Sequence, residues 1–369
     1  MTSDDGAVPA PIARAEATAY TIPTDQPESD GTLRWTEVTI VVVEVTAGGR
    51  TGLGYSYTHA AASRIVNETL ADTVSGISAL DPPRAWSAMR HRVRNLGREG
   101  VVAGAISAVD VALWDLKARL LDLPLARLLG MVRDKVPAYG SGGFTSYGSK
   151  RLQEELGAWA DLGFKAVKMK VGRYPDDDVK RVRAARDAVG KRTELFVDAN
   201  GAFDRKQALK MAEQFAELDV SWYEEPVSSD DLEGMRLVRD RAPSGMRVAA
   251  GEYGWELAYF RRMLEAGAVD VLQADATRCL GITGLLHVAA LAEAHQLPLS
   301  THTAPSLHLH PACSVVPLVN TEYFIDHARI EELLFEGAPR PRDGQLIPDL
   351  SRPGMGLEIK RDDAAPYAA

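Results

Sequence analysis

Short apolar segments alternate with longer amphipathic ones from about residue 136 onward. The apolar segments have the length of strands, and the stretches between them, such as "DDVKRVRAARDAVG", have the spacing of amphipathic helices. Repeated strand–helix units predict parallel strands, and about eight of them favour a closed α/β barrel over an open, doubly wound sheet. The expected strands are residues 136–142, 164–172, 194–201, 220–226, 247–252, 270–275, 297–303 and, more weakly, 321–324.

A different pattern precedes residue 136. Residues 36–45 and 51–58 read as strands on either side of "TAGGR", a hairpin signal, and residues 13–25 are a candidate third strand. Helical periodicity follows and is clearest in "AGAISAVDVALWDLKARLLD". The glycine-rich "YGSGG" after the first strand of the later region does not match GxGxxG, so a dinucleotide-binding fold is disfavoured.

Composition narrows the classes of partner. The 369 residues are 46% hydrophobic and 25% charged, as in an ordinary globular protein. The net charge of −9 argues against nucleic acid or an anionic membrane as a partner, although a local site can still be positive. Two cysteines provide no disulfide framework. No secretion signal follows Met1 and no apolar run could span a bilayer, so a cytoplasmic protein is expected.

Polar residues stand at the carboxyl end of strand after strand in the predicted barrel. Side chains alternate faces along a strand, so Lys168 and Lys170 share a face, as do Asp198 and Asn200. In a parallel barrel these ends meet on one face, where catalytic groups lie. A single strand-end residue usually meets solvent or caps a helix, but a repeated pattern is better explained by a site. The set is Lys168, Lys170, Asp198, Asn200, Glu224, Glu252, Asp275 and His302.

Three of these residues, Asp198, Glu224 and Glu252, form a candidate metal site. Three carboxylates packed together repel one another unless a cation neutralises them, and an all-oxygen shell suits Mg²⁺. The alternative is that Glu224 pairs with an arginine on a surface loop. Histidines are a rival ligand set, which we rank lower because the carboxylates already suit a hard cation; they are His302, His308 and His310.

Lys170 and His302 are the candidate acid–base pair. Lys168 would depress the pKa of Lys170 by like-charge repulsion, although the nearby carboxylates oppose this effect. Asp275 could orient the His302 imidazole and fix its tautomer. The alternative for His302 is a core histidine that is hydrogen-bonded to the backbone.

A base on each side of one metal indicates chemistry at the carbon α to a carboxylate. The α-proton becomes acidic when the carboxylate is chelated, because the metal stabilises the enediolate that forms. Reprotonation of the same carbon from the other face would give a racemase or epimerase of a 2-hydroxy acid. Protonation of a β-hydroxyl would instead release water and give a 2-keto-3-deoxy acid.

These motifs together resemble the enolase superfamily, specifically its mandelate racemase-like subgroup with its acid-sugar dehydratases. The likeness covers nearly the whole chain and rests on "KMK", "DAN", "EEP", "GE", "LQADATRCLGITG" and "STHTA". It implies a modified TIM barrel, (β/α)₇β, with an N-terminal α+β capping domain. The implied divisions are a cap at 1–132, a barrel at 133–330 and a C-terminal segment at 331–369 that returns to the cap. One departure is "CLGITG", where the family commonly has paired glycines.

The resemblance also implies roles for single residues. Asp198, Glu224 and Glu252 would bind Mg²⁺. Lys170 would be a base, with Lys168 near the substrate carboxylate, and His302 with Asp275 would be the opposing dyad. A protonated Glu322 would hydrogen-bond the substrate carboxylate, and Asn200 a substrate hydroxyl. A homo-oligomer is implied as well. Cycloisomerases rank lower, because related enzymes of that kind usually have a lysine on the strand that carries Asp275.

Specificity in this family comes largely from cap loops over the barrel mouth, here residues 21–31 and 54–63. Both are polar, which favours a polyhydroxylated acid, an aldonate or aldarate, over an aryl substrate; the alternative is that they are merely solvated. Arg94 and Arg98 would bind a distal carboxylate or pair on a helix surface. The expected further contacts are Thr24, Tyr57, His59 and Ser141. The preferred hypothesis is a Mg²⁺-dependent sugar-acid dehydratase; a racemase or epimerase is the alternative, and a non-catalytic binding protein the alternative of another class.

Overall fold

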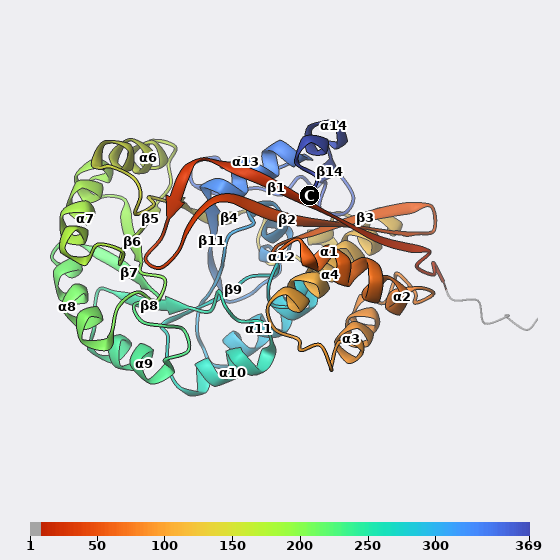
Figure 1. Ribbon diagram of the computed structural model, residues 1–369, viewed down its shortest axis with the longest axis horizontal. Coiled ribbons are helices and arrows are strands. Elements are labelled where there is room, and N and C mark those ends of the chain that lie inside the picture. The colour runs from red at the N-terminus through yellow and green to blue at the C-terminus, as the bar shows by residue number, and fades with distance from the viewer. Residues whose placement is uncertain (1–8) are drawn as a thin grey trace, which may run out of the picture.

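The computed structural model describes residues 9–369, and its larger part is a closed barrel of eight parallel strands (Figure 1). Neighbouring strands follow chain order, and β11 pairs with β4 to close the barrel. The predicted TIM barrel is therefore confirmed. Its strands are β4 (Val136–Gly142), β5 (Ala166–Lys170), β6 (Glu194–Asp198), β7 (Val220–Glu224), β8 (Arg247–Ala250), β9 (Val271–Ala274), β10 (Leu299–Thr301) and β11 (Leu318–Phe324).

Amphipathic helices connect the strands and cover the outside of the barrel. In α10, for example, Phe260, Met263 and Leu264 are buried at helical spacing. The barrel interior is also filled: Phe196 and Trp222 stack with ring centroids 4.9 Å apart, so the barrel is a packed core rather than a pore. The connecting helices are α6 (Ser149–Asp161), α7 (Pro175–Val189), α8 (Arg205–Ala216), α9 (Leu232–Arg241), α10 (Leu257–Glu265), α11 (Gly281–Ala294) and α12 (Pro305–Ala312).

The smaller part is the predicted α+β cap, which is confirmed. Three antiparallel strands lie in the order β1–β2–β3, and helix α4 packs on β3. Glycine is needed at this contact, because a Cβ on Gly52 would lie 2.3 Å from the carbonyl oxygen of Ala112. The elements are β1 (Arg14–Ser29), β2 (Arg34–Ala47), β3 (Arg50–Tyr57), α1 (Ala61–Ile65), a π-helical turn (Val66–Leu70), α2 (Ala71–Val74), α3 (Pro82–Arg92), α4 (Val101–Leu120) and α5 (Leu125–Leu129).

The C-terminal residues run back to the cap. The backbone N–H of Ala369 donates to the carbonyl of Ala19 (3.0 Å), and Arg361 pairs with Glu44 on β2. Figure 1 shows this blue end of the chain beside the red and orange strands. The elements after β11 are α13 (Ile325–Leu334), β12 (Phe335–Glu336), β13 (Gln345–Leu346), β14 (Glu358–Ile359), α14 (Arg361–Ala364) and a 3₁₀ turn (Ala365–Tyr367).

Leu280, the departure from paired glycines, joins the barrel to the cap. It has a left-handed backbone conformation with φ +69° just before α11, and its side chain packs into the cap core. The indole N–H of Trp86 on α3 donates to the Leu280 carbonyl (2.9 Å). The strained turn is therefore held by packing and by a hydrogen bond from the cap.

A buried polar contact fixes the cap to α13. The hydroxyl of Tyr55 donates to Oε1 of Glu331 (2.7 Å), and the backbone N–H of Ser306 donates to Oε2 (2.9 Å). Tyr55 and Glu331 are both almost fully buried. Each carboxylate oxygen of Glu331 thus has a donor from a different part of the fold.

We expect Tyr55→Phe to lower the free energy of unfolding by about 1–3 kcal/mol, because a buried carboxylate oxygen would lose its donor. Denaturant titration of the variant and the wild type measures the difference. Tyr174→Phe is the matched control, since Tyr174 is 56% exposed, and should change stability by less than about 0.5 kcal/mol. Equal stabilities for the wild type and Tyr55→Phe would contradict the expectation.

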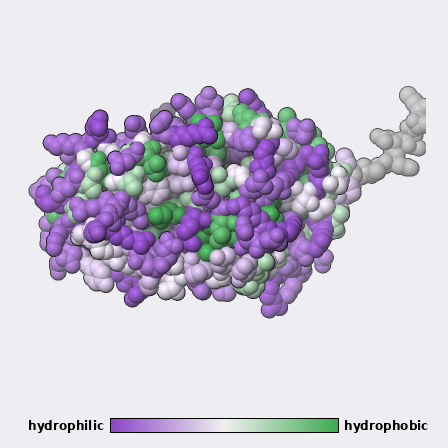
Figure 2. All heavy atoms as spheres, turned by 90° about the horizontal axis from the view of Figure 1, so that it is seen from above, coloured by the Kyte–Doolittle hydropathy of each residue, from purple (hydrophilic) through white to green (hydrophobic). Residues whose placement is uncertain are grey.

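Polar and charged residues dominate the face shown in Figure 2, and apolar residues form only smaller groups on it. Most of the apolar side chains lie in the cores of the barrel and the cap. Among residues 9–369, no helix combines the length and the apolarity that a membrane crossing requires.

Candidate active site

The barrel register brings the predicted site residues together at the carboxyl ends of the strands. Lys170 pairs with Asp198 across β5 and β6, and Asp198 pairs with Glu224 across β6 and β7. Glu252 follows the end of β8, and Glu322 lies on β11. Neighbouring parallel strands with aligned ends therefore place side chains that are 26 or more residues apart in the chain around one point.

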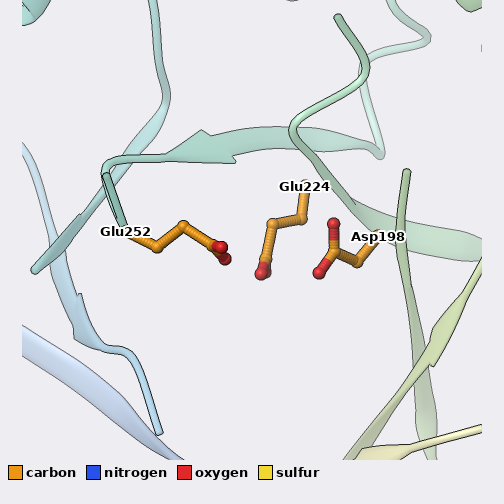
Figure 3. A group of neighbouring side chains, drawn as sticks. All are labelled: Asp198, Glu224 and Glu252. Carbon is orange, nitrogen blue, oxygen red and sulfur yellow. The ribbon is translucent and has the colours of Figure 1, made fainter. Parts of the chain in front are cut away.

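Asp198, Glu224 and Glu252 converge, as Figure 3 shows. Each offers one carboxylate oxygen, these oxygens lie within 4.8 Å of one another, and all three residues are buried. Oε2 of Glu252 is buried 3.2 Å from Nε2 of His302, and Oδ1 of Asp198 accepts from the backbone N–H of Asn200 (2.8 Å). Three buried oxygen donors with a lone pair to spare fit a hard divalent cation such as Mg²⁺.

A different basic side chain contacts each carboxylate of this cluster. Lys168 pairs with Glu224, and Lys170 pairs with Asp198 at 2.5 Å. Nε2 of His302 lies 3.2 Å from Oε2 of Glu252. These contacts explain how two lysines can be buried on one strand face: their charges offset those of the carboxylates.

The carboxylates also decide the pKa of Lys170. Burial and Lys168 lower the pKa of Lys170, as predicted from the sequence, but Asp198, Glu252 and Glu224 together outweigh them and raise it above its usual range. In this structure Lys170 is thus an ammonium group. The repulsion from Lys168 is present, but it changes the pKa of Lys170 less than the attraction to Asp198 does.

His302 is held by Asp275. Nδ1 of His302 lies 2.9 Å from Oδ2 of Asp275, while Oδ1 of Asp275 accepts from the backbone N–H of Thr277 (2.7 Å). This contact places the proton on Nδ1 and directs Nε2 toward the carboxylate cluster. Burial lowers the pKa of His302, but Glu252 and Asp275 outweigh it and raise the pKa to about 9.

Glu322 does not meet the requirement for a protonated carboxyl group. Burial alone would raise its pKa, but Lys168, at 2.8 Å, and the other nearby bases lower it to about 2. The backbone N–H of Thr303 also donates to Oε2 of Glu322 (2.9 Å). An ammonium group beside the carboxylate therefore gives no support to a protonated Glu322, and its contact with the substrate carboxylate stays a prediction.

A cavity of about 250 Å³ opens above the carboxylate cluster. Lys170, Asn200, Glu252, His302 and Glu322 line it, whereas Lys168, Asp198, Glu224 and Asp275 lie buried beside them. The remaining lining residues are Asp30, Leu33, Trp35, Glu37, Val38, Tyr253, Arg278, Thr303, Phe324, Asp326 and His327.

The four other expected substrate contacts do not line this cavity. Ser141 is buried next to Lys168 across β4 and β5, and its hydroxyl has no partner among the described residues. Tyr57 stacks on His327, with ring centroids 3.4 Å apart. Thr24 donates to the carbonyl of Gln26, and His59 is exposed and accepts from the backbone N–H of Ala61. Their contact with substrate stays a prediction.

Sequence reasoning missed His327 and the β2 residues that line the cavity, among them Trp35 and Glu37, whereas Asp30 lies in the cap loop 21–31 that was expected over the barrel mouth. His327 follows β11 by a few residues, so the strand-end rule could have found it. The β2 residues carry no such signal, because they reach the cavity only through the packing of the cap on the barrel.

The histidines of "HLH" have structural contacts. The ring of His308 connects two backbone segments: Nδ1 lies 2.8 Å from the Thr303 carbonyl, and Nε2 accepts from the N–H of Ala276 (2.9 Å). Nδ1 of His310 accepts from the N–H of Ala126 (3.1 Å). Among residues 9–369, the three carboxylates are the only group identified that could hold a metal ion. A histidine metal site is therefore not found there.

Arg94 and Arg98 lie outside the cavity lining. Arg98 pairs with Glu256 (2.9 Å), and Arg94 donates to the side chain of the neighbouring Asn95. Of the two expected roles, surface pairing is the one that this geometry supports.

His310 should make the fold sensitive to acid. Burial lowers the pKa of His310 from 6.5 to about 4, so the folded protein binds this proton more weakly than the unfolded chain. The stability that neutral His310 supports is then lost as the pH falls from about 6.5 to 4, by about 2–3 kcal/mol. His310→Asn keeps an acceptor for Ala126 and should remove this part of the pH dependence. Urea unfolding at pH 7 and pH 4.5 tests it; equal pH dependence in both proteins would contradict it.

The fold and the site together define a class. A capped parallel barrel with three carboxylates, two lysines and a His–Asp pair at its carboxyl ends is the arrangement of the enolase superfamily. The chain belongs to the mandelate racemase / muconate lactonizing enzyme family. Residues 19–130 match the N-terminal domain model of that family, and residues 151–364 match the "Enolase C-terminal domain-like" model.

Named relatives have several activities. The chain is 32% identical to the L-talarate/galactarate dehydratase of Salmonella typhimurium over 332 residues, which cover 88% of this chain and 81% of that protein. It is 36% identical to the 3,6-anhydro-alpha-L-galactonate cycloisomerase of Streptomyces coelicolor over 314 residues, with coverages of 82% and 86%.

Solved structures agree with the fold. A mandelate racemase/muconate lactonizing enzyme-like protein from Rubrobacter xylanophilus has a TM-score of 0.96 at 55% identity, covering 97% of this chain and all of that one. The Salmonella dehydratase liganded with Mg and L-lyxarohydroxamate has a TM-score of 0.90 at 27% identity, with coverages of 100% and 95%.

Proposed function

We propose that this protein is a Mg²⁺-dependent dehydratase of sugar acids that forms 2-keto-3-deoxy acids. The observation that carries the proposal is the placement of two bases in one cavity, Lys170 beside Asp198 and His302 beside Glu252. The dehydratases among the relatives support the same class of reaction.

Asp198, Glu224 and Glu252 would hold Mg²⁺, which when bound supplies the positive charge that makes the α-proton of a substrate carboxylate removable. The relative liganded with Mg supports this choice of metal. The ammonium group of Lys168 would hold the substrate carboxylate, and Glu322, paired with it at 2.8 Å, would orient that group.

Two proton transfers then remove water from the substrate. With Asp198 engaged by the metal, this carboxylate would hold the Lys170 proton less strongly, and neutral Nζ of Lys170 would take the α-proton from one side of the substrate. Nε2 of His302 gives a proton to the departing β-hydroxyl on the other side, while Asp275 holds the imidazole in place (2.9 Å). The bond to the hydroxyl breaks as the new double bond forms. The enol product then gains a proton from water at C3 and gives up its hydroxyl proton to water, which yields the 2-keto-3-deoxy acid.

Proton NMR in D₂O tests the proposal with the Mg²⁺-loaded enzyme and a library of aldonic, aldaric and simple 2-hydroxy acids. A 2-keto-3-deoxy product with deuterium at C3 is the expected result. Exchange of the α-proton without loss of water would instead make the protein a racemase or epimerase. No reaction with any acid, together with no Mg²⁺ binding, would favour a binding protein.

Cycloisomerisation of a sugar-acid derivative is a second candidate, because a relative with 36% identity bears that name. Asp275 occupies the position where a lysine was expected for such enzymes. A lactone or anhydro sugar acid in the same NMR experiment separates the two reactions, since cycloisomerisation conserves the mass of the substrate and dehydration of an open-chain acid does not.

The proposed homo-oligomer is tested by light scattering of the protein as it elutes from a size-exclusion column.

A further inference from the structure

The β1–β2 turn of the cap closes one side of the cavity, which we call its cap end. The backbone N–H of Thr145 donates to the Ser29 carbonyl (2.8 Å), and Arg173 donates to the carbonyls of Asp30 and Leu33. A Cβ on Gly31 would lie 2.3 Å from the carbonyl oxygen of Ala199, so the turn is pressed against the β6–α8 connection. This cap end of the cavity is thus a fixed surface of the folded protein.

The cations that line the cavity belong to its metal end. They are Lys170 and Arg278. Lys170 pairs with Asp198, and Arg278 lies 3.6 Å from Asp275 and 3.7 Å from Glu252. Carboxylates of the metal end therefore already offset both positive charges.

The charged residues at the cap end are all acidic. They are Asp30 and Glu37 from the cap and Asp326, which follows β11. Asp326 is only 3% exposed. Arg329 approaches Asp326 to 3.7 Å, but it donates to the Pro23 carbonyl and does not line the cavity. Within residues 9–369, no lysine or arginine faces the cavity at this end.

A second buried acid, Glu28, lies beside Asp326. The indole N–H of Trp35 donates to Glu28 (3.0 Å), which is 2% exposed. Burial and the hydrogen bond with Asp326 raise the pKa of Glu28 to about 10. Burial therefore favours the protonated form of Glu28, which can donate its proton to Asp326 beside the cavity.

His327 supplies a neutral hydrogen-bond donor next to Asp326. Nδ1 of His327 accepts from the backbone N–H of Ala304 (3.3 Å), which leaves the proton on Nε2. The side chain is 7% exposed, lines the cavity, and is clamped against the ring of Tyr57. Burial and the nearby His302 hold the pKa of His327 well below its usual range, so the ring is uncharged. No partner for Nε2 occurs among the described residues.

We propose that the cap end selects sugar acids with a single carboxylate, the aldonates, over the corresponding dicarboxylic aldarates. The inference rests on the proposed function and narrows its substrate class. At the far end of the substrate, hydroxyl groups donate hydrogen bonds to Asp326 and accept one from Nε2 of His327. A second substrate carboxylate there would face Asp30, Glu37 and Asp326 with no cation beside it. The repulsion between these like charges would weaken binding of the dicarboxylic acid relative to the monocarboxylic acid.

Matched pairs test the proposal, because an aldonate and its aldarate can share every stereocentre. Suitable pairs are D-gluconate with D-glucarate, D-galactonate with galactarate, and D-xylonate with xylarate. Turnover of the Mg²⁺-loaded enzyme gives kcat/KM, and calorimetry with the Lys170→Ala variant gives Kd without turnover. For the pair with the accepted configuration, we expect the aldonate to be preferred by about 10- to 100-fold.

Variants locate the preference. Asp326→Asn and the exposed Glu37→Gln should each raise the kcat/KM for the aldarate relative to that for the aldonate by about tenfold. His327→Asn keeps an acceptor for the N–H of Ala304 but loses the donor at Nε2, so it should lower the kcat/KM for the aldonate by a similar factor. Asp187→Asn, at an exposed position on α7 outside the cavity, is the charge control and should leave the ratio unchanged. Thermal unfolding checks that each variant is folded.

The outcomes separate this inference from the proposed function. Dehydration of aldarates in preference to aldonates would keep the function and overturn the selection. Tighter binding of an aldonate than of its aldarate, without turnover of any acid, would keep the selection and overturn dehydration. If neither member of any pair binds or reacts, both proposals fail.

Discussion

Lys170→Ala and His302→Asn are each expected to lower the turnover of the sugar-acid substrate by about 10²- to 10⁴-fold, the usual contribution of a positioned acid or base. Each variant removes a group that faces the cavity: Nζ of Lys170, or Nε2 of His302. Asn at position 302 can still donate to Asp275, which holds Nδ1 of the native ring at 2.9 Å. The loss would then report the missing proton rather than a collapsed site.

Isotope exchange distinguishes the two roles. If Lys170 takes the α-proton, Lys170→Ala should stop both exchange of the α-proton in D₂O and release of water. His302→Asn should stop the release of water but still allow exchange at the α-carbon. Proton NMR and product assays measure both quantities in one sample, with Asp187→Asn as the control for a distant charge change. Continued exchange in Lys170→Ala would assign the base to another residue.

Glu252→Gln and Asp198→Asn are expected to weaken Mg²⁺ binding by at least about 100-fold and to abolish turnover. Each replacement removes one of three carboxylates whose oxygens lie within 4.8 Å of one another. An amide can occupy the same space, but it carries no charge to balance a divalent ion. Asp198→Asn also removes the carboxylate that pairs with Lys170, and an unpaired ammonium group beside the metal position disfavours the cation further.

Calorimetry and thermal unfolding measure this second prediction independently of activity. A ligand that binds only the folded state stabilises it by about 2.7 kcal/mol at 100 times its Kd, so Mg²⁺ should raise the unfolding temperature of the wild type by a few degrees. The two variants should show no such rise, and Asp187→Asn should behave as the wild type. Unchanged Mg²⁺ binding in Glu252→Gln would place the metal elsewhere.

The barrel was predictable because its signal is local. Strands buried on both faces need apolar residues at most positions, and the polar residues at their ends stand out against this background. β4 has the predicted bounds, 136–142, and β5 to β10 lie within the predicted segments. β11 begins earlier than predicted, at Leu318, because Asn320 and Thr321 interrupt the apolar pattern there.

The carboxylate cluster was also predictable, since parallel register brings strand ends together whatever their distance along the chain. The sign of the pKa shifts was not, because it depends on which of several charges lies nearest. Asp198 at 2.5 Å outweighs Lys168 in setting the pKa of Lys170, and Lys168 at 2.8 Å keeps Glu322 ionised.

By itself the sequence determined the strands, the helices and the order in which chemical groups reach the barrel mouth, because periodicity and strand direction follow from short stretches of chain. Only the tertiary structure decided which surface closes the cavity. Tyr57 and Asp30 are both in polar segments of the cap, yet Tyr57 packs behind His327 while Asp30 faces the cavity. That difference arises from how the β-sheet of the cap packs on the barrel, which no local pattern encodes.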